Sequence, residues 1–332
     1  MTRVAVMGGD GIGPEVVDAT MHILEQMELG LEFVRAEMGL ACFERTGHHL
    51  PKETIKTLES SRAALFGAIT TPPRPDPDHR SPILQLRNHF DLYANVRPCT
   101  PLLPELGKVD LNAVIVRENT EGMYTGRERE EDGAVILERV VSERGCHRIV
   151  EKAIDVARSR GMHKVTCVHK ANVLRRSDGL FRRVFYATME NSGLQADDMI
   201  VDATAAALIS KPSVFECIVT LNLYGDILSD EAAALTGGLG MAPSANIGDS
   251  FALFEPVHGS APDIAGKDIA NPSATILTAC MLLEYVDMKD AAIDLRSALV
   301  RTLKEGDRTR DIGGTLGTMR FAEKVAERLT SD

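Results

Sequence analysis

Residues 4–26 read VAVMGGDGIGPEVVDATMHILEQ and decide the fold. The β-branched run Val4–Met7 predicts a strand, and the spacing of apolar residues in Pro14–Gln26 predicts an amphipathic helix after a glycine loop. The loop is close to the dinucleotide fingerprint G-x-G-x-x-G, but its spacing is G-x-G-x-G, and Pro14 stands where the third glycine would be. That glycine lets helix and strand approach closely, so a conventional Rossmann domain is disfavoured. The loop is either a tight structural turn or a turn that also lines a ligand cleft.

Short apolar runs alternate with helical segments along most of the chain. Further strands are predicted at Ala63–Phe66, Val114–Val116, Val165–Val168 and Cys217–Thr220. Helices are predicted at Ser142–Arg160, Gly179–Met189, Ile227–Leu235 and Ala274–Tyr285. This alternation is typical of an α/β protein in which helices cover a sheet. With 332 residues, the chain is long enough for two domains or one large α/β unit.

Two segments break this alternation. Thr71–His79 contains four prolines in nine positions, which predicts an exposed, stiffened loop. Residues 125–141 carry polar ends around the apolar run Ala134–Leu137, which is consistent with a hairpin arm that turns at Asp132 and Gly133. Because such an arm has little core of its own, we expect it to be buried against a second subunit.

Composition and charge argue against several classes of partner. The formal net charge of −11 and the scattered basic residues disfavour nucleic acid. No stretch reaches the roughly 18 consecutive apolar residues that a membrane helix needs. The six cysteines are scattered without a C-x-x-C pair, which indicates reduced, packed thiols in a cytoplasmic protein. The first residues enter a strand directly, without the basic segment of a targeting sequence, which agrees with that location.

The strongest local signal is the run LNLYGDILSD at residues 221–230. Asp226 and Asp230 are four residues apart at the start of a predicted helix, so both carboxylates lie on one face. In a first turn the helix dipole offsets part of their repulsion, and a bound divalent cation would remove it. Hard oxygen ligands favour Mg²⁺ or Mn²⁺ over zinc. A solvated first turn without a metal is the alternative.

Three arginines, Arg87, Arg97 and Arg117, stand at or just after apolar runs. Converging guanidinium groups would suit a di- or tricarboxylate, because each planar fork binds a carboxylate through two hydrogen bonds; separate surface charges are the alternative. Tyr124 and Lys170 follow predicted strands, where α/β proteins place side chains that contact ligands. A packed aromatic and an ordinary surface charge are the alternatives for these two.

Taken together, these segments resemble the β-decarboxylating dehydrogenases, the family of isocitrate, 3-isopropylmalate and homoisocitrate dehydrogenases. The resemblance runs from GGDGIGPE at residues 8–15 to DIGG at residues 311–314. Its most specific motifs are DLYANVRP (91–98), RENTEG (117–122), HKAN (169–172), YGDILSD (224–230) and EPVHGSAPDIAG (255–266).

The resemblance implies an α/β fold of the isocitrate/isopropylmalate dehydrogenase type, with two domains and an active site in the cleft between them, and not a Rossmann fold. A large coenzyme-binding domain would comprise residues 1–95 and 238–332, and a small dimerisation domain residues 96–237. The arm at 125–141 would pair with a second subunit in a homodimer. The sequence leaves open whether dimers pair into tetramers.

The resemblance also implies roles for individual residues. The malate-like carboxylates of a small di- or tricarboxylate substrate would be held by Arg87, Arg97 and Arg117. Mg²⁺ or Mn²⁺ would be bound by Asp226 and Asp230, together with Asp202 from the neighbouring subunit. Lys170, also from the neighbour, would be the general base, and Tyr124 the general acid.

The expected coenzyme is NAD. Asp263 and Ile264 stand where NADP-using relatives carry lysine and tyrosine. A carboxylate there can accept hydrogen bonds from both ribose hydroxyls and would repel a 2′-phosphate. The coenzyme site is expected to be lined by Ile12, Thr70, His258, Gly259, Ser260, Ala261 and Asn271.

The third substituent on the malate core decides the substrate, and the relevant stretch is RSPILQLR at residues 80–87. Isocitrate enzymes place serine and asparagine at the positions of Ser81 and Ile83, so the missing asparagine disfavours isocitrate. Isopropylmalate enzymes use apolar side chains at 83 and 84 but usually lack Arg-Ser-Pro. The whole pattern looks most like that of fungal and methanogen homoisocitrate dehydrogenases.

The first expected reaction is therefore the conversion of homoisocitrate to 2-oxoadipate, with 3-isopropylmalate as the alternative, followed by isocitrate, tartrate or malate. Arg80 or Thr71 would bind the distal carboxylate, and Ser81 and Asn172 would be further substrate contacts. A non-catalytic regulatory subunit of an NAD-isocitrate dehydrogenase is a distant alternative. Such subunits typically lose a base, an acid or a metal ligand, whereas this chain keeps all of them.

Overall fold

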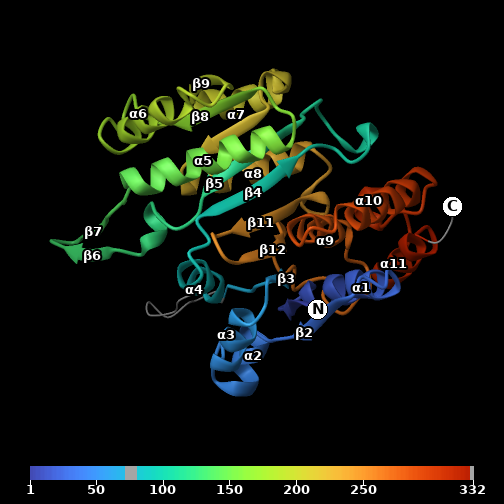
Figure 1. The fold of residues 1–332 in the computed structure, drawn as a ribbon. Coiled ribbons are helices and arrows are strands. Elements are labelled where there is room, and N and C mark those ends of the chain that lie inside the picture. The colour runs from blue at the N-terminus through green and yellow to red at the C-terminus, as the bar shows by residue number, and fades with distance from the viewer. Residues whose placement is uncertain (72–80, 330–332) are drawn as a thin grey trace. The chain divides into compact units, whose positions relative to one another are not determined.

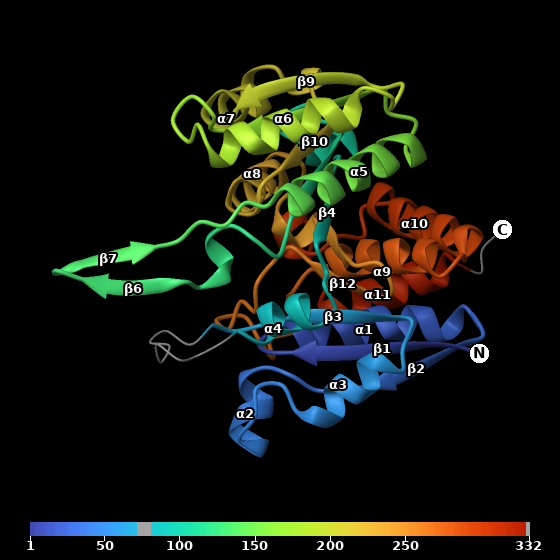
Figure 2. The ribbon, with the colours of Figure 1, turned by 60° about the vertical axis from the view of Figure 1, so that its left-hand side comes forward.

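The computed structural model describes residues 1–71 and 81–329. The chain divides into two compact units, Met1–Phe90 with Gly237–Asp332, and Asp91–Thr236. Their helices and strands are labelled in Figures 1 and 2. The predicted α/β alternation is confirmed in both units. The predicted proline-rich loop lies outside the described residues, except for Thr71, which is exposed. No helix within the described ranges is long and apolar enough to cross a membrane.

The sheet of the first unit combines strands from both ends of the chain. In spatial order its strands are β2 (Leu31–Arg35), β1 (Thr2–Gly9), β3 (Ala63–Ala68), β12 (Ala252–Pro256) and β11 (Pro243–Ile247). The β12–β11 pair is antiparallel and the other pairs are parallel. Every residue of β3 is buried, as expected for a central strand covered on both faces.

The helices of this unit bury their apolar faces on the sheet and on one another. They are α1 (Gly13–Gln26), α2 (Leu40–Thr46), α3 (Lys52–Glu59), α4 (Pro82–His89), α9 (Ser273–Tyr285), α10 (Lys289–Lys304) and α11 (Thr318–Glu327), with short 3₁₀ turns η4 (Leu239–Met241) and η5 (Arg310–Ile312). Helix α9 packs against β11, β12 and α10 and buries 11 of its 13 residues, which explains why it is apolar on all sides. Helices α1 and α11 lie side by side, so the two ends of the chain meet (Figure 1).

The second unit has its own layered core. In spatial order its sheet consists of β4 (Ala94–Cys99), β5 (Ala113–Glu118), β10 (Cys217–Thr220), β8 (Lys164–His169) and β9 (Gln195–Ile200); the β4–β5 pair is antiparallel and the others are parallel. Its helices are α5 (Glu143–Ser159), α6 (Ser177–Met189), α7 (Val201–Ser210) and α8 (Asn222–Leu235), and its 3₁₀ turns are η1 (Pro104–Leu106), η2 (Met123–Thr125) and η3 (Pro212–Val214). Helices α5 and α6 cover one face of this sheet, and α7 and α8 cover the other (Figures 1 and 2).

The predicted hairpin arm is confirmed. Strands β6 (Glu128–Glu131) and β7 (Ala134–Leu137) pair antiparallel around Asp132 and Gly133. Their φ angles of 50° and 77° are those of the type I′ turn that the right-handed twist of a hairpin favours. Figure 2 shows the arm extending away from the helices of its own unit.

The predicted start of α8 is wrong. We expected the helix from Ile227, but it begins at Asn222. Asp226 and Asp230 are therefore its fifth and ninth residues and lie beyond the first turn. Because the dipole effect fades within the first turn, it does not offset the repulsion between these carboxylates. Another source of positive charge must do so.

Candidate active site

Two buried arginines from neighbouring strands supply that charge. Arg97 on β4 and Arg117 on β5 are only 7% and 1% exposed, so each guanidinium needs partners to compensate for lost hydration. Arg117 donates from Nε and Nη2 to Asn222 Oδ1, at 3.1 and 2.7 Å, and its Nη1 pairs with Asp226. A Cβ on Gly225 would lie 2.7 Å from Arg117 Cβ. The glycine inside α8 therefore makes room for this arginine.

Arg97 reaches the next turn of the same helix. Its Nη1 donates to Ser229 Oγ at 2.6 Å and to Asp230 Oδ1 at 3.1 Å, and its Nε donates to Asn95 Oδ1 at 2.6 Å. Its Nη2 lies 3.6 Å from Asp226 Oδ1. The polar face of α8 thus contacts both guanidinium groups, whose positive charges offset the repulsion between Asp226 and Asp230.

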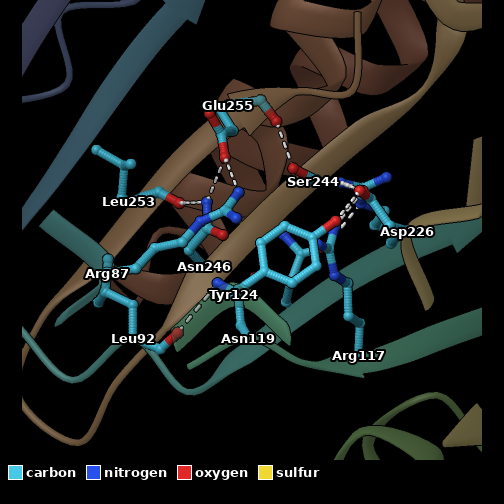
Figure 3. Close-up of polar contacts among 12 residues, drawn as sticks. Arg87, Leu92, Arg117, Asn119, Tyr124, Asp226, Ser244, Asn246, Leu253 and Glu255 are labelled. Carbon is cyan, nitrogen blue, oxygen red and sulfur yellow. Dashed lines mark hydrogen bonds and ion pairs between the residues drawn. The ribbon is translucent and has the colours of Figure 1, made fainter. Parts of the chain in front are cut away.

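Tyr124 joins this group from η2, the short turn that follows β5. Its hydroxyl donates to Asp226 Oδ2 at 2.6 Å, and the Arg117 guanidinium carbon lies 5.2 Å from its ring centre, which is within cation–π range. Figure 3 shows Tyr124 and Arg117 both directed at Asp226. The structure therefore brings together five of the residues singled out from the sequence: Arg97, Arg117, Tyr124, Asp226 and Asp230.

The donor set fits a hard divalent cation, but one chain holds only part of it. Burial is the main reason that the pKa of the Asp230 carboxyl lies above its ordinary value; the Arg97 charge opposes this and the Asp226 charge adds to it. Added positive charge beside Asp230 would restore its ionised form. Among the described residues, no three acidic, histidine or cysteine side chains gather into a metal site. Asp202 therefore does not join Asp226 and Asp230 within a single chain.

Lys170 and Asp202 pair with each other instead. Lys170 follows β8 directly, and its Nζ donates to Asp202 Oδ1 on α7. This hydrogen bond is the main reason that the pKa of Asp202 lies below its ordinary value. The Asp202 side chain is 60% exposed, and Asn172 in the same turn as Lys170 is exposed as well. These three side chains are open to a further partner.

Arg87 belongs to the other unit, on α4. It is buried, and its Nη2 donates to Glu255 Oε1 at 3.2 Å, an oxygen that also accepts from Asn246 Nδ2 at 2.8 Å (Figure 3). Among the described residues, Arg87 Nε is buried without a hydrogen-bond partner. A buried donor without an acceptor is costly, so this edge of the guanidinium is suited to an anionic ligand.

The stretch before Arg87 offers mostly apolar surface. Ile83 is buried one helical turn before the arginine, Leu84 is half-buried beside it, and Ser81 precedes the helix. Residues 83 and 87 share a face of α4 because they are four apart. Thr71 is described and exposed, whereas Arg80 lies outside the described residues.

Several of the residues expected at the coenzyme site contact the glycine loop of the first unit or one another. Ile12 N donates to Ser260 O at 2.8 Å, and Thr70 Oγ1 donates to Ser260 Oγ at 2.8 Å. A Cβ on Gly11 would lie 1.9 Å from Ser260 O, so the close approach requires this glycine. Asp10, which we did not single out from the sequence, accepts from Thr70 N at 2.9 Å and fixes that segment.

His258 is the clearest candidate for a ligand contact among these residues. Its Nδ1 lies 2.9 Å from the Gly259 carbonyl oxygen and must donate to it, which leaves Nε2 as an acceptor in the neutral ring. Among the described residues, that buried Nε2 has no partner. Burial lowers the pKa of His258 below its ordinary value of 6.5, against the opposing effects of the Gly259 carbonyl and Glu255.

The remaining residues expected at the coenzyme site differ in exposure and in the hydrogen bonds that they already make. Asp263 is exposed, whereas Ile264 packs against Ile12 and Val16, and Ala261 has a positive φ of 37°. Asn271 is buried and already bonds Asp311 Oδ2 at 3.0 Å through its amide nitrogen. Its visible role is structural.

Comparisons with known proteins agree with this geometry. Residues 3–325 match the family model described as isocitrate/isopropylmalate dehydrogenase. The chain is 50% identical to a 3-isopropylmalate dehydrogenase of Methanothermobacter thermautotrophicus, covering 98% of each chain. It is 47% identical to a homoisocitrate dehydrogenase of Methanocaldococcus jannaschii, covering 98% of this chain and 97% of that one. The crystal structure of isocitrate dehydrogenase from Methylococcus capsulatus matches with a TM-score of 0.95 at 40% identity, and the match covers both chains completely.

These matches span nearly the whole chain, and the matched structure has the isocitrate dehydrogenase fold, which confirms the expected departure from the Rossmann type. Relatives named for different substrates stand at nearly the same identity. The chain therefore belongs to the isocitrate/isopropylmalate dehydrogenase family, whose members are oxidative decarboxylating dehydrogenases.

Proposed function

We propose that this chain oxidises a 2-hydroxy acid built on a malate core with NAD and a divalent cation, and then releases CO₂ from the product. The observation that carries the proposal is the cluster of Arg97, Arg117, Tyr124, Asp226 and Asp230. It combines cations for carboxylates, oxygen donors for a hard cation, and a hydroxyl that can move a proton.

The arginines are proposed to hold the substrate. Arg97 and Arg117 are fixed by Asn95 and Asn222, so little side-chain entropy remains to be lost on binding. Arg87 offers its unpartnered Nε to a further carboxylate. Charge-assisted bonds of this kind are roughly twice as strong as neutral ones.

Asp226 and Asp230 are proposed to hold the metal, with Asp202 of a second copy completing the site. A bound Mg²⁺ or Mn²⁺ supplies positive charge that lowers the pKa of a substrate hydroxyl and favours loss of CO₂ from a β-keto acid. A homodimer with shared sites follows from this assignment, because among the described residues of one chain no third acidic side chain joins Asp226 and Asp230.

Lys170 Nζ is proposed to take the proton of the substrate hydroxyl, and Tyr124 Oη to protonate the carbon that loses CO₂. The coenzyme site of this chain would hold NAD, which would supply the acceptor for the hydride. Each proton-transfer group is held by an aspartate in this chain, Lys170 by Asp202 and Tyr124 by Asp226. Each therefore has to turn from its carboxylate toward the substrate.

The coenzyme is proposed to be NAD because Asp263 is exposed and anionic. Its carboxylate can accept from ribose hydroxyls and would repel a 2′-phosphate. His258 Nε2 can accept a further hydrogen bond from the adenosine part. The six cysteines are all buried free thiols, which supports the proposed cytoplasmic location.

Homoisocitrate is the first candidate substrate, because RSPILQLR resembles the corresponding stretch of homoisocitrate enzymes. One structural observation favours 3-isopropylmalate as the second. The buried Ile83 and the half-buried Leu84 lie on the same helix as Arg87, and apolar side chains at these positions suit an isopropyl group better than a carboxylate.

A kinetic panel tests the proposal. The purified chain is assayed for kcat/KM with homoisocitrate, 3-isopropylmalate, isocitrate and D-malate, each with NAD and NADP. We expect turnover with NAD, loss of turnover after chelation, and recovery with Mn²⁺. Asp226→Asn should lower kcat/KM at least about 10³-fold, because it removes an oxygen donor from the cation and the charged partner of Arg97, Arg117 and Tyr124. Full turnover after exhaustive chelation would refute the metal assignment, and a preference above about tenfold for isopropylmalate would replace the first substrate by the second.

A further inference from the structure

Asp178 is a buried carboxylate that none of the proposed chemical steps uses. It is the second residue of α6, and its side chain is fully buried. Its Oδ2 accepts from the backbone N of Lys170 at 2.7 Å and from the Tyr224 hydroxyl at 3.0 Å. Its Oδ1 pairs with Arg139 and accepts from Ser177 Oγ at 3.3 Å. A buried charge with this many partners holds its neighbours in one arrangement.

The partners come from three separate segments. Lys170 begins the turn after β8. Tyr224 lies on α8, two residues before Asp226, and Arg139 lies two residues beyond β7, where the hairpin arm returns to its unit. The Arg139 guanidinium carbon also lies 5.1 Å from the centre of the Tyr224 ring. Asp178, Arg139 and Tyr224 therefore form a closed set of contacts between the arm, α8 and the Lys170 turn.

The base of the arm is tied to Tyr124 as well. Gly122 and Val140 exchange two backbone hydrogen bonds of 2.8 and 3.2 Å, and Tyr124 follows Gly122 by two residues. Both proposed proton-transfer residues are thus attached to residues 139–140, Tyr124 through the backbone and Lys170 through Asp178.

The Lys170 turn has little freedom of its own. His169 Nδ1 accepts from Ala171 N at 3.0 Å, and its Nε2 donates to Asp198 Oδ2 at 2.9 Å. Asp178 accepts from Lys170 N and His169 accepts from Ala171 N, so two successive backbone N–H groups donate to side chains. The direction in which the lysine side chain leaves the backbone is set by these two acceptors.

We propose that Asp178 is a positioning residue, which links the base of the hairpin arm to the turn that carries Lys170 and so aims the Lys170 ammonium group. This inference rests on the proposed role of Lys170 as the base. It predicts that breaking the Asp178–Arg139 contact slows the chemical step and leaves substrate binding intact, because neither residue is assigned to the substrate.

The test uses the full chain and separates the two contacts of Asp178. Asp178→Asn keeps a side-chain oxygen that can accept from Lys170 N. It places an amide NH₂ group next to Arg139, where the charged oxygen was, and so breaks the ion pair. We expect kcat to fall about 10²-fold, as misplacement by about 1 Å can cause, with KM for hydroxy acid and NAD unchanged within roughly threefold. Arg139→Gln should act in the same way, and the double variant should lose no more than the worse single one, because both break the same link. Arg139→Lys keeps a cation for Asp178 and should recover most of kcat.

Ser177→Ala is the matched control. It removes a hydroxyl that accepts from Arg139 Nη1 and donates to Asp178 Oδ1, each at 3.3 Å, but it leaves the Asp178–Arg139 pair itself in place. It should therefore keep wild-type kcat. If Asp178→Asn does not fold, the Arg139→Gln and Arg139→Lys pair decides, and wild-type kcat in Arg139→Gln overturns the inference. Lys170→Met separates the two proposals. An active Lys170→Met refutes the role of Lys170 itself, whereas an inactive one together with a fully active Asp178→Asn refutes only the positioning role.

Discussion

At the scale of single residues, the site shows how a charged side chain can be held in a protein core. Arg117 is almost fully buried, yet its hydrogen-bond donors meet Asn222 and Asp226 on one helix. Gly225 between them lacks the Cβ that would collide with the arginine. A glycine inside a helix costs about 1 kcal/mol relative to alanine, and here that cost accompanies a fixed guanidinium at the end of β5.

The lowered pKa of His258 predicts how the stability of the fold depends on pH. Because burial lowers its pKa below 6.5, the unfolded chain binds a proton at this position before the folded chain does. Stability is therefore lost as the pH falls from 6.5 to the lower folded-state value, and no further loss follows below it. His258→Gln should reduce the difference in melting temperature between about pH 7.5 and about pH 5.5.

The exposed His48 provides the control, and His48→Gln should keep the wild-type difference. An unchanged difference in His258→Gln would show that this ring does not stay neutral in the fold. It would also remove the support for Nε2 as an acceptor toward the coenzyme.

At the scale of elements, the N-terminal cap of α5 predicts a measurable contribution to the stability of the fold. Ser142 Oγ accepts from Gly145 N at 2.9 Å and donates to Glu121, which also accepts from Ser142 N at 2.8 Å. Ser142→Ala should lower the free energy of unfolding by about 1 kcal/mol, the usual value of such a cap, as measured by denaturant unfolding. Ser159→Ala, at the exposed end of the same helix, should change it by less than about 0.5 kcal/mol; equal losses would mean that the cap adds nothing.

The same scale shows which elements could be predicted from the sequence. Strands that are rich in β-branched residues, such as Val165–Val168 and Cys217–Thr220, were found because burial on both faces favours that pattern. Strand β4 was missed because it carries Arg97 and Pro98, and β9 because half of the residues of this edge strand are polar. The start of α8 was placed too late because Asn222 and Gly225 look like helix breakers, and only the packing of Arg117 explains them.

The site could be predicted in part for a similar reason. The motifs identified Arg117, Tyr124 and Asp226, whose types carry the chemistry. They contain Asn222, Ser229 and Glu255 but did not indicate that these are the polar partners that hold the arginines. Such partners depend on contacts between segments more than 100 residues apart, and no local spacing reveals them.

At the scale of the whole molecule, the hairpin arm predicts an assembly. A two-stranded hairpin is marginally stable alone in water, yet β7 exposes Val135 and Leu137, at 69% and 37%. A second copy that covers this strand would bury both side chains, and the proposed sharing of Asp202 and Lys170 between copies requires such an assembly.

Val135→Glu therefore should weaken a dimer. Burial of a valine contributes about 1.5 kcal/mol or more, and an unpaired buried carboxylate adds a larger cost, so the dimer dissociation constant should rise at least about 10²-fold. Sedimentation measures this change, and specific activity should become dependent on protein concentration if Asp202 of the neighbour completes the metal site as proposed. Glu130→Gln, directly opposite Val135 on β6, changes charge without removing apolar surface and should leave the dimer intact. A monomeric Val135→Glu chain with wild-type kcat would mean that each chain builds its site alone, and the assignment of Asp202 to the neighbour would then fall.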